Sequence, residues 1–134
     1  GFTYTSLEEL LRSSDVVSIH VRLSPETVDL ISREQLASMK PSAMLINTAR
    51  GPIVNKDALN EALREKRIAG AGLDVFHQEP LDPSDPLLKL DNVVLTPHNA
   101  GQTPEALKKG LDMAVDNIIN FFKGDPTNLV VYPR

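Results

Sequence analysis

The sequence contains no cysteine among its 134 residues. Neither a disulfide framework nor thiolate chemistry is therefore available, and this composition fits a reducing compartment, so we expect a cytoplasmic protein. No apolar run approaches the roughly 20 residues that a membrane-spanning helix needs, and no signal peptide is visible, so no membrane partner is expected. The chain begins with Gly1 rather than Met, which fits either a piece of a longer protein or a processed start.

Clusters of basic residues are missing as well. The formal net charge is -4, and the Lys and Arg residues form no stripe along the chain. This argues against nucleic acid as a partner. With 41% apolar and 24% charged residues the composition is that of an ordinary globular protein. The length fits one domain.

Three catalytic or binding motifs are also absent. No Gly-x-Gly-x-x-Gly fingerprint occurs, because Gly70-Ala71-Gly72 is followed by Val75 at the third position and lies inside an expected strand. No Gly-x-Ser-x-Gly elbow occurs, which weakens the case for a serine hydrolase. No His-x-x-x-His or comparable ligand spacing occurs, so no metal site is expected.

Short apolar runs alternate with helical patterns along the chain. The expected strands are Val16–Ile19, Ala43–Ile46, Ala69–Leu73 and Val93–Leu95. The polar residues that end them recur at intervals of roughly 25 residues, the length of a repeated strand–helix unit with right-handed crossovers. This predicts an α/β fold with a parallel sheet. A further short run, Leu129–Val131, is a candidate strand that could belong to another domain.

Capping signals precede each helical pattern. They are Ser6 with Glu9, Ser32 with Gln35, Asn55, and Thr103 with Pro104. The last helix is expected to be long and to end at Gly124. Its expected inward face consists of Leu107, Leu111, Ala114, Val115, Ile118 and Phe122. Prolines between Gln78 and Asp91 predict an ordered loop with little regular helix.

Chemically active side chains follow these strands. Arg50 comes after the second strand, and Gly51-Pro52 forces a turn there. Asp74 ends the third strand and His98 follows the fourth. Because ligands of open parallel sheets bind beyond the carboxyl ends of the strands, one cleft is expected to collect these side chains together with Glu79.

Each residue has a plainer interpretation. Arg50 could be a solvated surface arginine, Asp74 could cap its own turn, and His98 could be structural. Glu79 and His98 make the stronger case, since a carboxylate beside an imidazole fixes its tautomer, favours its protonated form and provides a general acid or base. His20 and His77 have weaker cases, because neither has an obvious carboxylate companion.

Four segments together resemble the D-isomer-specific 2-hydroxyacid dehydrogenase family. They are residues 14–21 with Thr27, residues 46–51, residues 72–76 with Glu79-Pro80, and residues 96–101. The resemblance covers essentially the whole chain, and the glyoxylate/hydroxypyruvate reductase and phosphoglycerate dehydrogenase group is the most similar. It implies the latter half of a Rossmann-type sheet with flanking helices. It assigns residues 1–101 to a partial nucleotide-binding domain, and residues 102–134 to a connecting helix and a return segment to a substrate domain.

The resemblance also implies a mechanism with NAD or NADP. Arg50 would bind the carboxylate and carbonyl oxygen of a 2-oxo acid, His98 would donate a proton to that oxygen, and Glu79 would hold His98. Asp74 would face the nicotinamide carboxamide. The implied cofactor-binding residues are Val21, Thr48, Ala49, Arg50, Asp74, His98, Asn99, Ala100 and Gly101.

Two departures from the family pattern stand out. Arg22 occupies a position where the pattern usually has Pro, and this adds charge and mobility beside the cofactor. The Gly-rich turn and the N-terminal substrate lobe are absent from these residues, so we expect little or no turnover by the chain alone. An open edge at Val16–Ile19, or the last helix, would then favour a homo-oligomer.

Alternative functions remain open at this point. Some relatives in the family act as dinucleotide-responsive corepressors or scaffolds, so a non-catalytic binding module is the second hypothesis. A hydrolase using His98 and Glu79 is the third, although no Ser or Cys nucleophile is positioned for it. These motifs do not identify the residues that select NAD or NADP. They do not identify the particular substrate either.

Overall fold

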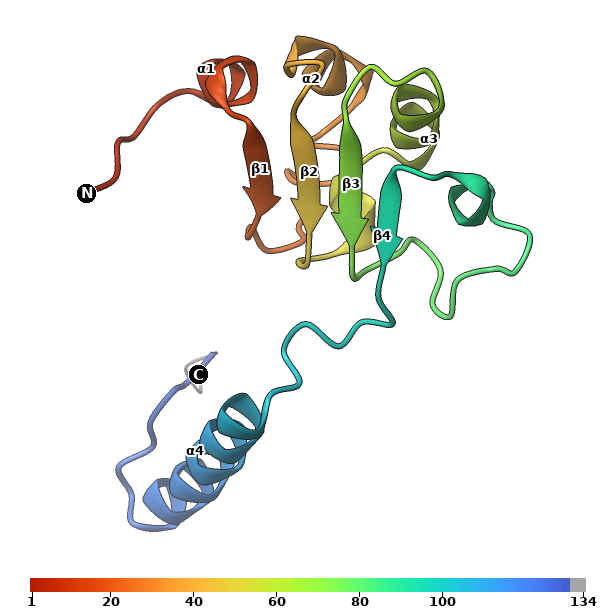
Figure 1. Ribbon diagram of the computed structural model, residues 1–134. Coiled ribbons are helices and arrows are strands. Elements are labelled where there is room, and N and C mark those ends of the chain that lie inside the picture. Colours follow the sequence, from red (N-terminus) through yellow and green to blue (C-terminus); the bar gives the residue numbers. More distant parts are fainter. Residues whose placement is uncertain (131–134) are drawn as a thin grey trace. The chain divides into compact units, whose positions relative to one another are not determined.

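A computed structural model of the chain describes residues 1–130 and contains a parallel four-stranded sheet within them. The strands β1 (Val16–Ile19), β2 (Met44–Asn47), β3 (Gly70–Leu73) and β4 (Val93–Leu95) lie side by side in that order (Figure 1). The predicted parallel α/β sheet is thus confirmed. The expected strands β1 and β4 have the bounds given from sequence, whereas β2 begins and ends one residue later and β3 begins one residue later.

Helices alternate with the strands, with a 3-10 turn in place of a helix between β3 and β4. They are α1 (Leu7–Ser13), α2 (Arg33–Ser38), α3 (Lys56–Arg64) and α4 (Pro104–Phe122), with short 3-10 turns η1 (Gly51–Ile53) and η2 (Pro86–Lys89). The turn after Arg50 is therefore η1, and η2 is the one short helical turn in the proline-containing loop, within the described residues. The peptide bond between Glu79 and Pro80 is cis.

The predicted N-caps form in the structure. The side chains of Ser6, Asn55 and Thr103 accept hydrogen bonds from first-turn backbone N–H groups of α1, α3 and α4. At α2, the Ser32 N–H donates to the Gln35 side chain at 3.2 Å, as a capping box requires. Gly124 ends the last helix with a φ of 78°, a backbone conformation that glycine adopts without strain.

One face of the sheet forms the hydrophobic core. Val17, Leu45 and Ala71 point to this face from neighbouring strands and are buried. Against them pack buried leucines of the three short helices, namely Leu11, Leu36, Leu59 and Leu63. In Figure 1, α2 and α3 lie behind the sheet. Each fully buried leucine contributes about 1.5–3 kcal/mol, so this layer holds the strands in register and fixes the edge where they end.

The opposite face of the sheet is only partly covered within residues 1–99. Val16 on β1 is 59% exposed and Val94 on β4 is 66% exposed. Between them lie Met44 and Ile46, which are intermediate in burial, and the glycines of β3. A sheet face with this composition is apolar and open to solvent in this part of the chain.

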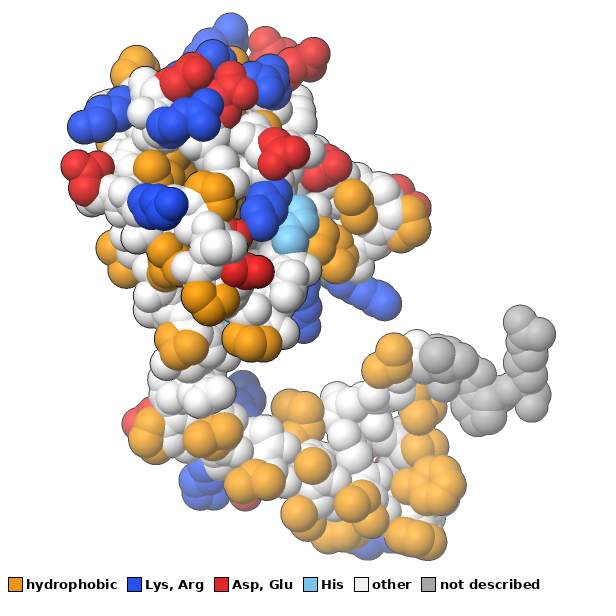
Figure 2. Space-filling view, turned by 90° about the vertical axis from the view of Figure 1, so that its right-hand side faces the viewer, with side chains coloured by type: hydrophobic (Ala, Val, Ile, Leu, Met, Phe, Trp, Pro, Cys, Tyr) orange, Lys and Arg blue, Asp and Glu red, His pale blue; other side chains and the backbone are white. Residues whose placement is uncertain are grey.

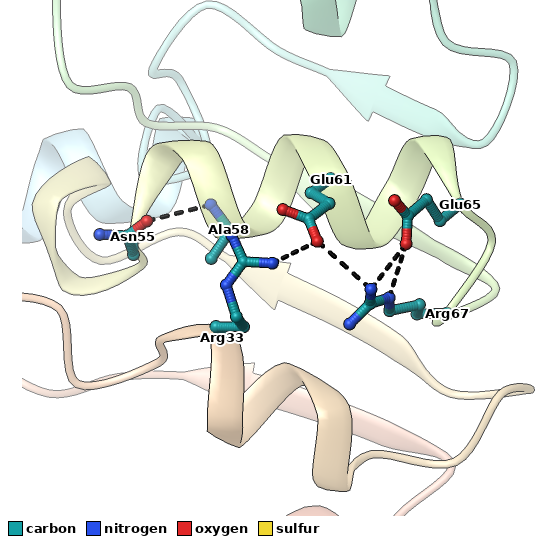
Figure 3. Close-up of polar contacts among 6 residues, drawn as sticks. All are labelled: Arg33, Asn55, Ala58, Glu61, Glu65 and Arg67. Atoms are coloured by element: carbon teal, nitrogen blue, oxygen red, sulfur yellow. Dashed lines mark hydrogen bonds and ion pairs between the residues drawn. The ribbon is translucent and has the colours of Figure 1, made fainter.

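Ion pairs join the two middle helices at the surface (Figure 3). Glu61 on α3 accepts from Arg33 of α2 and, at 3.2 Å, from Arg67. Arg67 also pairs with Glu65 at 2.7 Å. Both arginines hold the Glu61 carboxylate in its ionised form, and the Arg33 hydrogen bond is the main reason that the pKa of Glu61 lies below its usual range.

The chain divides into two compact units, residues 1–99 and residues 100–134. The second unit consists chiefly of α4, and none of its described helical residues is buried. The expected inward face of this helix is therefore exposed, with Leu111 at 69% and Phe122 at 82%. Figure 2 shows the hydrophobic side chains crowding the surface of this unit. Helical periodicity predicted the apolar stripe correctly, but periodicity carries no information about what covers such a stripe.

The end of the chain was also expected to contain a short strand. Leu129 and Val130 lie outside any strand, and Val131 falls outside the described residues. Among the described residues, no helix combines the length and the hydropathy that a membrane crossing would require.

Candidate active site

The segments that follow the four strands meet at the carboxyl edge of the sheet. The parallel register aligns Ile19, Asn47 and Leu73 across β1, β2 and β3, and Leu73 pairs with Leu95 of β4. Every segment that carries a predicted site residue in the first unit therefore starts from the same border. This is where ligands bind in open parallel sheets.

His98 and Glu79 are brought together at this edge. The Nδ1 of His98 donates to Oε2 of Glu79 at 2.7 Å, and both side chains are partly exposed. The other carboxylate oxygen, Oε1, accepts from the Phe76 N–H at 3.0 Å. The His98 hydrogen bond and then the Phe76 N–H lower the pKa of Glu79, so this side chain is an anion at neutral pH. The Nε2 of His98 is then the ring nitrogen left to face a ligand.

The backbone at His98 adopts an uncommon conformation. Its φ is 52°, in the left-handed region that side chains other than glycine rarely adopt. Asp74 holds the residues on both sides, since its Oδ1 accepts from Thr96 Oγ1 at 2.6 Å and from the Asn99 N–H at 2.9 Å. Asp74 is 3% exposed, so these bonds are shielded from water. The loop thereby fixes the direction of the imidazole.

The turn that carries Arg50 is held by hydrogen bonds to the side chain of Asn47. Asn47 is buried, and its side chain donates to the Arg50 carbonyl at 2.9 Å and accepts from the Ala49 N–H at 3.0 Å. The exposed guanidinium of Arg50 donates to the Ala49 carbonyl at 2.6 Å. Arg50 also helps to lower the pKa of Glu79, although less than His98 does, so its charge acts on the Glu79–His98 pair.

Two clefts lie along this edge. The first, which we call the β1–β2 cleft, has a volume of about 470 Å³ and is lined by residues 20–23 and 48–50. The second, the β3–β4 cleft, has a volume of about 460 Å³, and Glu79 and His98 line it with Phe76 and Pro97. The structure therefore places Arg50 in one cleft with Val21, Thr48 and Ala49, and the Glu79–His98 pair in the other. Ala100 and Gly101 begin the second unit.

The loop that carries Glu79 is anchored by contacts that the sequence did not reveal. Asp85 is 3% exposed, and its Oδ2 pairs with Lys56 Nζ of α3 at 2.7 Å. This carboxylate is the main cause of a raised pKa for Lys56. Near the other end of the loop, His77 Nε2 donates to the Val54 carbonyl at 2.8 Å. No spacing rule pairs these residues, because they are brought together only by the tertiary fold.

Gly51 makes a close backbone approach to the same loop. A Cβ added to it would lie 2.2 Å from the Phe76 carbonyl carbon and 2.6 Å from the His77 N, closer than any real contact. Glycine at this position is the signal in the sequence that could have indicated the approach, since close packing of two backbones is one of its uses. His20, the remaining histidine, hydrogen-bonds through Nε2 to Ser18 Oγ at 2.8 Å.

Comparison with known proteins places this geometry in a family. Residues 1–100 match the family described as "D-isomer specific 2-hydroxyacid dehydrogenase, NAD binding domain". The chain belongs to this family. The family and the Rossmann-type fold expected from the sequence motifs are thus confirmed.

Individual relatives agree with this assignment. The chain is 53% identical over 131 residues to a glyoxylate reductase from Korarchaeum cryptofilum, covering 97% of this chain and 40% of that protein. Among solved structures, it resembles an acyclic imino acid reductase in complex with NADPH and D-Arg, with a TM-score of 0.89 and 35% identity over 95% of this chain and 40% of the other.

An NAD complex is also among the similar structures. A D-isomer specific 2-hydroxyacid dehydrogenase from Lactobacillus delbrueckii ssp. bulgaricus gives a TM-score of 0.86 and 37% identity, covering 96% of this chain and 43% of that one. The matched domain and these complexes confirm a nicotinamide dinucleotide as the cofactor type. The chain spans about two fifths of the length of these proteins.

Proposed function

We propose that this chain supplies the acid–base pair and the substrate arginine for the NAD(P)-dependent interconversion of a D-2-hydroxy acid and its 2-oxo acid. The observation that carries the proposal is the 2.7 Å hydrogen bond between His98 Nδ1 and Glu79 Oε2 at the carboxyl edge of the sheet. A carboxylate on Nδ1 leaves Nε2 as the position from which a proton is given or taken.

His98 acts in this proposal as general acid for reduction and as general base for oxidation. In reduction the protonated imidazole gives its Nε2–H to the oxygen of the 2-oxo group and becomes neutral. In oxidation Nε2 takes that proton back, and Glu79 balances the positive charge that then develops on the ring. Because Oε1 of Glu79 is bonded to the Phe76 N–H, the carboxylate cannot rotate without losing a hydrogen bond. The pair is thus held in one orientation before a substrate arrives.

Arg50 takes the substrate carboxylate in this proposal. Its planar guanidinium can offer two parallel N–H groups to a carboxylate, which fixes both position and orientation. Its backbone is fixed by Asn47, and its side chain is exposed in the β1–β2 cleft. The positive charge beside the acid–base pair also favours an anionic substrate.

The residues present fit part of a nicotinamide dinucleotide. The β1–β2 cleft, at about 470 Å³, lies within the roughly 300–1,000 Å³ range of small-molecule sites. Val21, Thr48, Ala49 and Arg50 would line the cofactor on this side, and His98 with Asn99 on the other. When bound, the dinucleotide supplies or accepts the hydride. Asp74 orients residues 96–99, and its contact with the carboxamide stays a prediction.

The test is a measurement of NADH and NADPH oxidation with glyoxylate and hydroxypyruvate. In the full-length protein, His98→Gln should lower kcat by at least about a hundredfold, since general acid–base catalysis contributes about 10²–10⁴. Arg50→Lys should act chiefly on KM, because it removes the two-pronged carboxylate contact. A full-length protein that binds dinucleotide but shows no turnover sensitive to His98→Gln would instead support a non-catalytic binding module.

The 134-residue chain by itself is expected to show little or no turnover. Its sequence has no Gly-rich turn to fix the pyrophosphate, so the reacting groups would not be held together long enough for hydride transfer. The same assay, carried out on the purified chain, checks this expectation. Robust oxidation of NADH with either substrate would contradict it.

A further inference from the structure

Positive charge gathers in the β1–β2 cleft of a chain whose net charge is -4. The lining contains two guanidinium groups, Arg22 and Arg50, and no Asp or Glu. Within residues 1–130, neither arginine takes part in an ion pair. In contrast, five other arginine and lysine side chains of the first unit are paired, namely Arg12, Arg33, Lys40, Lys56 and Arg67.

The backbone that carries Arg22 is fixed although its side chain is exposed. Thr27 Oγ1 donates to the Arg22 carbonyl at 2.8 Å and accepts from the Ser24 N–H, also at 2.8 Å. Leu23, the next residue, packs partly buried against the hydrophobic core. A fixed backbone lowers the entropy cost of holding the guanidinium over the cleft. The backbone of Arg22 is therefore preorganised for binding a ligand there.

The two arginines offer more donors than one small anion uses. Under the proposed function the carboxylate of a 2-oxo acid is assigned to Arg50, which leaves the guanidinium of Arg22 available to a second anionic group. A phosphate group, with up to two charges and three acceptor oxygens, matches a guanidinium better than any neutral group of a ligand.

We propose that Arg22 binds a phosphate group of a ligand in the β1–β2 cleft, beside the carboxylate held by Arg50. This inference rests on the proposed function, which gives the second anion its place. Proline, the residue usual at this position of the family pattern, offers neither charge nor donor. Arg22 would thus set a ligand preference that proline at this position could not provide. Two sources share the chemistry, a phosphate of the dinucleotide or a phosphate on the hydroxy acid.

The experiment titrates the full-length protein that contains this chain and follows backbone amide signals of residues 20–23 and 48–50 by NMR. The ligands are NADPH, NADH, 3-phosphoglycerate, glycerate and glyoxylate. The variants are Arg22→Ala and Arg50→Ala, with Arg64→Ala as a matched control, since Arg64 is an exposed arginine at the end of α3 and lies outside the cleft. Arg22→Lys tests whether charge alone suffices.

We expect Arg22→Ala to weaken binding of at least one phosphate-bearing ligand by about tenfold, the factor that corresponds to one lost charge-assisted hydrogen bond. Glyoxylate binding should not change in this variant. A loss greater for NADPH than for NADH identifies the extra phosphate of NADPH, and an equal loss for both identifies the pyrophosphate. A loss for 3-phosphoglycerate without one for glycerate identifies the substrate.

The inference is overturned if Arg22→Ala binds all three phosphate-bearing ligands as tightly as Arg64→Ala does. The arm with Arg50→Ala and glyoxylate decides the proposed function separately. If Arg50→Ala loses glyoxylate while Arg22→Ala changes nothing, the proposed function stands and the phosphate contact is refuted. Amide spectra of the free variants, which should match that of the wild type, show that each variant is folded.

Discussion

At the scale of single residues, the site depends on side chains that hold a histidine in an uncommon backbone conformation. Asp74 bonds to Thr96 and Asn99, the residues that flank the loop position of His98. A non-glycine residue at positive φ costs of order 1–3 kcal/mol, so it persists only where its neighbours determine it. The sequence showed a strand-end aspartate, but only the structure shows that it holds the histidine loop.

Thr96→Val tests this holding role. The variant keeps the shape of the side chain but leaves the buried Asp74 carboxylate without the hydroxyl at 2.6 Å. We expect the free energy of unfolding to fall by about 1–3 kcal/mol, the usual value of a hydrogen bond to a charged group. Urea unfolding measures it, with Thr3→Val at the exposed N-terminal end as control. Equal stability of the two variants would refute the role.

Glu79 gives a prediction for pH dependence. Its pKa is lowered in the folded chain, chiefly by His98, so the folded state prefers the carboxylate more than the unfolded state does. The stabilisation is therefore fully present above the unfolded pKa of about 4.3 and is lost as the pH falls through the lower, folded value. The effect should be modest, because the Glu79 side chain is 37% exposed and solvent screens it.

Measuring the free energy of unfolding between neutral and acidic pH checks whether this stabilisation is lost as the pH falls. Wild type should exceed Glu79→Gln in stability at neutral pH, and the difference should shrink as the carboxylate is protonated. Asp116→Asn, an exposed substitution on α4, serves as control and should give no such convergence. A difference that grows toward acidic pH would contradict the assignment of His98 as the partner that lowers this pKa.

At the scale of elements, the loop between β3 and β4 holds Glu79 in place beside His98. It carries Glu79 near its start and the buried Asp85 near its end, where Oδ1 also caps η2 by accepting from the Leu87 N–H at 3.0 Å. The ion pair between Asp85 and Lys56 anchors this loop to α3. The helix α3, the loop and the Glu79 carboxylate are thereby connected.

Lys56→Met should destabilise the loop between β3 and β4. The substitution leaves a carboxylate that is 3% exposed without its cation, a change that costs about 3 kcal/mol or more in buried pairs. Thermal unfolding should show the loss, and hydrogen exchange should show faster opening of residues 77–90. Adding Asp85→Asn should recover much of the stability, because the amide keeps the bond to Leu87 without a charge. No recovery in the double variant would count against a charge origin.

The elements themselves were largely readable from the sequence. Apolar runs and capping residues predicted the strands and the helix starts, because these signals are local. The one-residue shift of β2 follows from Asn47, a polar residue that reads as a strand end but is buried and pairs with Leu73. The Asp85–Lys56 contact joins distant positions, so no local pattern predicted it.

Convergence of the site was predicted only in part. The rule for strand ends brought Glu79 and His98 to one edge, where they bond. It did not predict that Arg50 lines a separate cleft, since the rule specifies a border and not the shape of the surface there. The catalytic and cofactor roles of these residues stay predictions.

At the scale of the whole molecule, we propose that the chain self-associates. Within the described residues, β1 pairs only with β2, so its other side offers unpaired backbone groups. On this strand, Val16 is 59% exposed. In the second unit, α4 carries an apolar stripe and none of its described residues is buried. Open edges and apolar stripes of this kind are the usual sites of pairing with another chain.

Sedimentation velocity over a range of concentrations tests this proposal. Wild type should form dimers or larger species as concentration rises, and Val16→Lys should shift the equilibrium toward monomer, because a charge on an edge strand opposes pairing. Val28→Lys, at an exposed site outside the sheet, is the matched control. A wild type that stays monomeric at high concentration would exclude both surfaces.

The glycine after Arg50 has a wider influence than its size suggests. Its backbone touches that of Phe76 and His77, and Phe76 in turn holds Glu79. The turn that carries Arg50 and the loop that carries Glu79 therefore meet at one backbone contact, which has no room for even a methyl group. Alanine at this position would push the two segments apart and shift Arg50 relative to Glu79 and His98, without altering any of these side chains.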